Sequence, residues 1–107
     1  MTIAQLFEQM PNQVNKSAIE GVHKTVQFKV TGDEPGQYYV VVNDGEVKVH
    51  KGVADNADAT INTPSDVWLK ISSGKLNGAV AFMTGKFQVE GDMMVLMSMQ
   101  NWFNMPN

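Results

Sequence analysis

The most informative absences in this 107-residue chain are those of cysteine and arginine. Without cysteine the chain forms no disulfide and offers no thiolate nucleophile or metal ligand, which suits a reducing compartment. Positive charge comes from lysine alone, and eight lysines are outweighed by eleven acidic residues, for a formal net charge of −3. Domains that bind nucleic acid carry a basic surface, often rich in arginine, so we expect no nucleic-acid partner.

Long hydrophobic runs are absent as well. No window approaches the roughly eighteen apolar residues of a membrane span, and the first residues lack the cationic stretch of a secretory signal peptide. We therefore expect a cytoplasmic protein that does not insert stably into membranes. At this length we expect a single domain over residues 1–107, with room for one hydrophobic core.

Groups for catalysis or for holding a cofactor are scarce. His23 and His50 are the only histidines; one lies at a strand entry and the other on the polar side of a predicted strand. Asp55 and Asp58 share a turn, but it lacks the glycine and the distal glutamate of a calcium loop. Two glycine-lysine pairs lack the spacing of a phosphate-binding loop. The sequence therefore predicts a protein that is not an enzyme and holds no metal ion or other cofactor.

Hydrophobic periodicity predicts an α+β fold. Apolar residues with the period of a helix occur at residues 2–10, 64–73 and 77–83, and from residue 93 onward. Alternating or β-branched segments predict five strands, at residues 22–31, 38–42, 46–51, 58–63 and 86–90. Turn residues separate the first three strands and predict an antiparallel meander. A helical crossover is expected before the last strand, and the helices are expected to cover one face of the sheet.

Side-chain alternation assigns the two faces of this sheet. Val26, Phe28 and Val30 point to one side of the first strand, which is expected to lie beneath the helices. The opposite face is expected to be solvated, and its polar residues are Gln27, Lys29, Glu46, Lys48 and His50.

Capping residues mark the predicted helix starts. Thr2 and Gln5 have the spacing of a capping box. Thr63 precedes Pro64 and is expected to cap the second helix. Asp92 is expected to cap the last helix, where its charge also suits the helix dipole.

The C-terminal segment stands out because residues 93–107 carry no charge and contain five of the eight methionines. On a helix, one arc of this segment would dock on the core, and its members are Val95, Leu96, Met99, Trp102 and Phe103. A second apolar arc comprises Met93, Met94, Met97 and Met105. Methionine is flexible and polarizable, so it suits partners of variable shape. The sequence leaves open whether a ligand, a second copy of the chain or the rest of the core covers this arc.

Several segments resemble the sterol carrier protein type 2 domain, in the same order along the chain from about Met10 to Met99. The most specific is the segment at residues 81–93, which reads Ala-Phe-Met-Thr-Gly-Lys-Phe-Gln-Val-Glu-Gly-Asp-Met. Further matching segments are residues 27–32, 38–42, 58–61, 68–70 and 73–76.

This resemblance implies a five-stranded sheet covered by helices, with a hydrophobic tunnel between sheet and helices. Family members take up fatty acids, fatty acyl-CoA, sterols or phospholipids, and the resemblance implies the same class of ligand here. It places the tunnel wall in the fifth strand, the crossover helices and the C-terminal helix, which here are represented by Phe82, Met83, Phe87, Val89, Met93, Met94 and Met97.

Apolar residues of the crossover complete the predicted site: Trp68, Ile71 and Leu76. The sequence therefore predicts non-enzymatic binding or transfer of a hydrophobic molecule. One alternative is an accessory module that presents a lipid intermediate to a biosynthetic enzyme. Another is a homodimer, formed through the C-terminal helix, in which the tunnel is vestigial.

Overall fold

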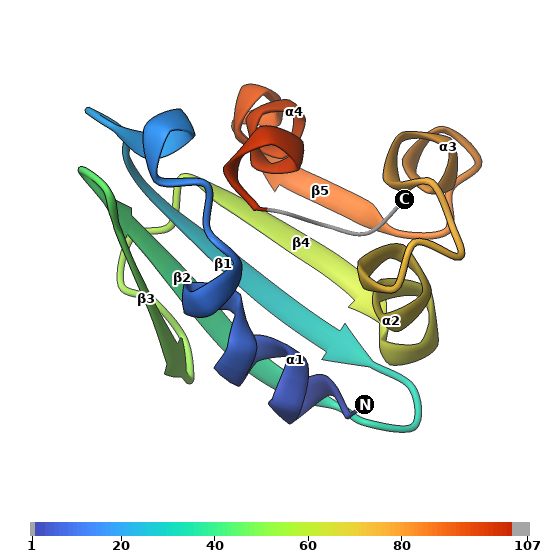
Figure 1. Ribbon diagram of the computed structural model, residues 1–107. Helices are drawn as coiled ribbons and strands as arrows, with labels where there is room; N and C mark the ends of the chain where they lie inside the picture. The colour runs from blue at the N-terminus through green and yellow to red at the C-terminus, as the bar shows by residue number, and fades with distance from the viewer. Residues whose placement is uncertain (1, 104–107) are drawn as a thin grey trace.

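A five-stranded sheet with helices on one face forms the protein (Figure 1). The computed structural model describes residues 2–103, the side chain of Gln100 excepted. The strands are β1 (His23–Thr31), β2 (Gly36–Asn43), β3 (Glu46–Lys51), β4 (Ala59–Pro64) and β5 (Gln88–Gly91), in the order β3-β2-β1-β4-β5. The α-helices are α1 (Ile3–Gln9), α2 (Ser65–Ser72), α3 (Gly78–Met83) and α4 (Met93–Trp102). Two short 3₁₀ helices, η1 (Met10–Gln13) and η2 (Lys16–Ile19), follow α1.

The predicted α+β class and the meander of the first three strands are confirmed. β1 pairs antiparallel with β2, and β2 pairs antiparallel with β3. The turn between β2 and β3 contains Asp44 and Gly45, with φ angles of 43° and 88°. This left-handed pair matches the right-handed twist of the two strands, which is why the sequence signal was strong.

The connection that crosses the sheet is not the helical one that the sequence predicts. β4 runs parallel to β1, so the crossing connection is residues 52–58 and not the helical segment. Gln27 holds this connection: its Nε2 donates to the carbonyl oxygen of Gly52 at 3.0 Å, and its Oε1 accepts from the amide of Ala54 at 2.7 Å. The expectation that Gln27 is solvated is therefore wrong, since the connection buries it. The alternation of side chains identifies the face of the sheet on which a residue lies, but not which other segment of the chain covers that face.

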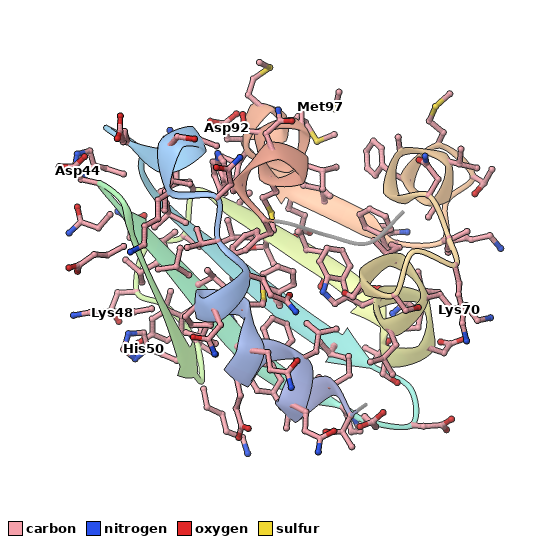
Figure 2. The ribbon with its side chains drawn as sticks, viewed as in Figure 1. Asp44, Lys48, His50, Lys70, Asp92 and Met97 are labelled. Carbon is pink, nitrogen blue, oxygen red and sulfur yellow. The ribbon has the colours of Figure 1, made fainter. Side chains whose placement is uncertain are left out.

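The remaining face assignments agree with the structure. The helix-covered side of the sheet buries Val26, Phe28, Val40, Val42 and Ile61. The polar side chains Lys29, Glu46, Lys48 and His50 are exposed on the opposite side. Figure 2 shows Lys48 and His50 on β3, pointing away from the helices. The apolar residues therefore gather on the helical side of the sheet, which is where a site for an apolar ligand is expected.

Two of the three predicted helix caps are present. Thr2 and Gln5 form the capping box of α1, and Asp92 Oδ1 accepts from the amide of Met94 at 2.9 Å at the start of α4. The Thr63 cap is wrong, because β4 continues through Pro64 and α2 begins at Ser65 without a side-chain cap. Thr63 is buried within the strand, and its hydroxyl donates to the carbonyl oxygen of Pro64.

The two arcs of α4 differ in exposure as predicted. The docking arc is buried, namely Val95, Leu96, Met99, Trp102 and, just after the helix, Phe103. Met93, Met94 and Met97 are exposed, and Figure 2 shows Met97 on the outer side of α4. Met105, the fourth member of the second arc, lies outside the described residues. An apolar surface on α4 is therefore left uncovered by residues 2–103.

Candidate ligand-binding pocket

An apolar pocket of about 290 Å³ lies among the helices on the covered side of the sheet. Its lining residues come from α1, η1, α2, α3 and α4. Two more are Phe87, just before β5, and Phe103, just after α4. Its lining consists of Leu6, Met10, Gln13, Trp68, Ile71, Ser72, Gly78, Ala79, Phe82, Met83, Phe87, Leu96, Met97, Met99 and Phe103.

Aromatic rings form the side of the pocket that faces the sheet. Trp68 of α2 packs edge-on against Phe28 of β1, with ring centroids 5.1 Å apart. Phe87, just before β5, meets Trp68 at 5.9 Å and Phe82 at 5.7 Å. The pocket lining contains no strand residue. The family resemblance implied a cavity directly between sheet and helices. The large rings of Trp68 and Phe87 here cover the strands and leave the free volume among the helices.

Six of the ten predicted site residues line this pocket: Trp68, Ile71, Phe82, Met83, Phe87 and Met97. The other four do not. Leu76, between α2 and α3, and Val89 of β5 are partly buried and pack against the core. Met93 and Met94 lie on the first turn of α4, and Met94 lines a separate, more polar cleft beside η2.

Several lining residues were not among the predicted ones. Leu6 and Met10 come from the N-terminal segment, where their spacing of four residues places them on one helical face. The sequence indicated that this face packs on the sheet, but not that it borders a cavity. Leu96 and Met99 belong to the docking arc of α4. The docking arc and the ligand wall are therefore not separate, because the pocket lies at the boundary between them.

Backbone pairing closes the pocket next to α4. The amide of Asn15 donates to the carbonyl oxygen of Trp102 at 2.7 Å, and Val14 and Phe103 form an isolated antiparallel bridge. These contacts join the segment after η1 to the end of α4. Phe103 and Met10 both line the pocket, so the N-terminal and C-terminal elements that these contacts join contribute to the same wall.

The lining is uncharged and almost entirely apolar, which suits an aliphatic or ring-containing molecule. Within residues 2–103, no group of three or more His, Cys, Asp or Glu side chains could hold a metal ion. The same part of the chain has no helix of the length and apolar character needed to cross a bilayer.

The sequence profile of the SCP-2 sterol transfer family matches residues 3–104. The chain belongs to this family. Lipid binding or transfer is accordingly the general function of this SCP-2 domain.

Known proteins similar to this SCP-2 domain include parts of longer chains. Hydroxysteroid dehydrogenase-like protein 2 of Xenopus laevis is 28% identical over 92 residues, which are 85% of this chain and 22% of that protein. The sec-alkylsulfatase Pisa1 of Pseudomonas has a structure with a TM-score of 0.85 at 18% identity, covering 100% of this chain and 17% of that one. The chain thus spans about a fifth of its curated relative.

A solved structure of similar length to this SCP-2 domain is palmitated SCP2L2 of Aedes aegypti. Its TM-score is 0.74 at 19% identity, and the match covers 100% of both chains. At this identity the likeness shows the shared fold.

Proposed function

We propose that this protein binds and transfers hydrophobic molecules in the helical pocket without catalysing a reaction. The observation that carries the proposal is an uncharged pocket of about 290 Å³ in a member of a lipid-transfer family. Fatty acids, fatty acyl-CoA, sterol-like molecules and phospholipids are the candidate ligands. The palmitate of the Aedes aegypti relative supports an acyl chain. We propose the cytoplasm as the location, in keeping with a cysteine-free chain.

The cost of an empty cavity favours occupancy. At about 24 cal/mol per Å³, a dry cavity of 290 Å³ would cost up to about 7 kcal/mol. The total stability of a domain is typically about 5–15 kcal/mol. Because this cost is a large share of the total, a ligand that fills the pocket should stabilise the protein and be retained during purification.

We expect lipid to accompany the protein when it is purified without detergent. An organic extract, examined by mass spectrometry, should contain a hydrophobic molecule in near-stoichiometric amount. Delipidated protein should then take up a fluorescent fatty acid, and the extract should displace it. A clean extract together with no fluorescent fatty-acid uptake would show that the pocket does not carry lipid.

Replacing Met97 by glutamine should weaken lipid uptake. Met97 lines the pocket while remaining 60% exposed, so the amide would stand against an apolar ligand without disturbing a packed core. We expect the ligand-free stability to change by less than about 1 kcal/mol. Uptake is measured by titration with a fluorescent fatty acid, and stability by urea unfolding of the delipidated protein.

Met94 provides the matched control for this substitution. It lies three residues earlier on α4 and is 69% exposed, but it does not line the pocket. Met94→Gln should therefore bind the fluorescent fatty acid as the unchanged protein does. Equal weakening by Met94→Gln and Met97→Gln would mean that the exposed methionines, and not the pocket, receive the lipid.

The second candidate function is presentation of a lipid intermediate to an enzyme. Two observations favour it: Met83, Met94 and Met97 leave an apolar surface exposed, and this chain matches only a part of the dehydrogenase-like relative and of the alkylsulfatase. A homodimer through α4, with a vestigial pocket, would cover Met94 and Met97. Light scattering over a range of concentrations distinguishes these cases, because only the homodimer predicts a mass that rises with concentration in the pure protein.

A further inference from the structure

Two polar side-chain atoms beside the pocket have no hydrogen-bond partner. They are Nε1 of Trp68 and Oγ of Ser72, both buried, and among the side chains that the structure describes they are the only buried nitrogen or oxygen atoms without one. Both residues line the pocket. They are four positions apart on α2 and therefore share one helical face. A buried polar group without a partner costs free energy, so two of them at one site require an explanation.

Neighbouring hydroxyl groups bond to backbone carbonyl oxygens three or four residues earlier, so a partner of this kind was also available to Ser72. Ser73 Oγ donates to the carbonyl oxygen of Lys70 at 3.2 Å, and Thr84 Oγ1 donates to that of Val80 at 2.8 Å. A serine in a helix can bond in the same way to the carbonyl of the preceding turn. Ser72 does not, which leaves its hydroxyl free for another molecule.

The surroundings restrict the chemistry of that molecule. The pocket lining has no charged residue, so an ionised carboxylate inside it would lose its hydration without gaining a counter-charge. Lys70 and Lys75 lie instead on an adjoining cleft that shares Leu6, Gln13 and Ser72 with the pocket. Figure 2 shows Lys70 extending outward from α2. Anionic groups are therefore favoured in the adjoining cleft, and neutral groups inside the pocket.

The two unpaired atoms define which neutral group fits. An indole N–H only donates a hydrogen bond, so the ligand atom beside Trp68 must accept one. The Ser72 hydroxyl can donate or accept. A hydroxyl, a ketone or an ester carbonyl meets both requirements, whereas a hydrocarbon meets neither.

We propose that Trp68 and Ser72 bind a neutral oxygen atom of the ligand and so select an uncharged oxygenated lipid, an alcohol, ketone or ester. This proposal rests on the proposed lipid-binding function and specifies its ligand class. A free fatty acid would bind in the opposite sense, with its carboxylate in the adjoining cleft near Lys70 and Lys75. Its affinity would then be independent of the two unpaired atoms.

Three twelve-carbon probes test the proposal: dodecane, 2-dodecanone and dodecanoate. Each displaces the neutral fluorophore N-phenyl-1-naphthylamine from delipidated protein, from Trp68→Phe and from Ser72→Ala. Phenylalanine retains an aromatic ring without the N–H, and alanine removes only the hydroxyl. For 2-dodecanone we expect each variant to lose about three- to tenfold in affinity, the value of one hydrogen bond. For dodecane and dodecanoate we expect less than a twofold change.

Two control variants separate this effect from general damage. Trp102→Phe and Ser98→Ala make the same chemical changes at residues that line neither the pocket nor the cleft with Lys70 and Lys75, and they should leave all three affinities unchanged. Urea unfolding of the ligand-free variants should show that Ser72→Ala is as stable as the unchanged protein or more so, since it loses an unpaired polar group. Trp68→Phe is expected to be less stable, because the smaller ring leaves part of a buried site empty. If Trp68→Phe does not fold, the affinities of Ser72→Ala for the three probes test the proposal by themselves.

The opposing outcomes are distinct. Equal losses for all three probes would mean that the two side chains act through packing, and unchanged ketone affinity would mean that they bind no ligand oxygen; either result overturns the proposal. A dodecanoate loss as large as the ketone loss would place a carboxylate inside the pocket and overturn the neutral class. If the unchanged protein binds none of the probes, the proposed lipid-binding function itself is wrong. The three outcomes described before it overturn only the proposed role of Trp68 and Ser72.

Discussion

Replacing Gly91 by alanine is expected to lower the free energy of unfolding by about 2–5 kcal/mol. Gly91 ends β5 with a φ of 90°, a left-handed conformation that residues with a Cβ rarely adopt. An added Cβ would lie 2.6 Å from the carbonyl oxygen of Asp58. That oxygen also accepts the amide hydrogen of Asp92, at 2.9 Å. The substitution therefore combines backbone strain with a clash that the neighbouring strand cannot avoid.

The control for this prediction is Gly45→Ala. Gly45 has a nearly identical φ of 88°, but a Cβ there would meet no atom within 4 Å. It should cost only the conformational part, about 1–2 kcal/mol. The difference between the free energies of unfolding of the two variants in urea gives the cost of the clash between β5 and the start of β4, apart from the cost of backbone strain. Equal losses in the two variants would show that the clash at Gly91 is relieved at little cost.

Gly91→Ala should also reduce lipid uptake. Asp92, the N-cap of α4, follows directly, and α4 supplies Leu96, Met97 and Met99 to the pocket. A shift of β5 away from β4 would move the start of α4 and with it this wall. We expect the folded fraction of Gly91→Ala to bind a fluorescent fatty acid more weakly, while Gly45→Ala, at the far turn, should bind normally.

Replacing Phe28 by alanine is expected to cost about 3–5 kcal/mol, as for other fully buried aromatic residues. Phe28 has no exposed surface, and its ring packs against Phe7 at 5.0 Å and Trp68 at 5.1 Å. The substitution would leave a cavity between the sheet and two helices. Because domains are typically stable by about 5–15 kcal/mol, the loss would be a large part of the total.

Tyr39→Ala is the matched control on the same sheet. Tyr39 lies on β2 but faces the other side, where it is half-buried and stacks on its cross-strand partner His50 at 4.9 Å. Loss of such a pair should cost about 0.2–1 kcal/mol. Urea unfolding of both variants provides the comparison. Similar losses would contradict the assignment of the core to the helix-covered face.

The sequence by itself determined the class of fold and most of its elements. Turn residues such as Asp44 and Gly45, the capping box at Thr2 and the cap at Asp92 act within a few residues of chain, so their effects are readable locally. Period-2 and period-3.6 patterns likewise report which side of an element is buried. For these reasons the three-stranded meander and the two arcs of α4 were predicted with their correct faces.

The concentration of apolar residues and the family resemblance identified part of the candidate pocket. Apolar residues that are concentrated in α2 and α3, such as Trp68 and Phe82, were predicted as site residues, and they line the pocket. The sequence could not exclude Val89 or Met93, because apolar character and helical or strand position do not reveal the distance to a cavity.

Only the tertiary structure decided which elements meet. Gln27 reads as a solvated strand residue, yet it is buried because residues 52–58 cross the sheet at that point and bring β4 beside β1. Leu6 and Leu96 border one pocket although ninety residues separate them in sequence. The unpaired atoms of Trp68 and Ser72 likewise become apparent only when every possible partner has been placed. Such features depend on distances between segments far apart in the chain, which local periodicity and capping do not encode.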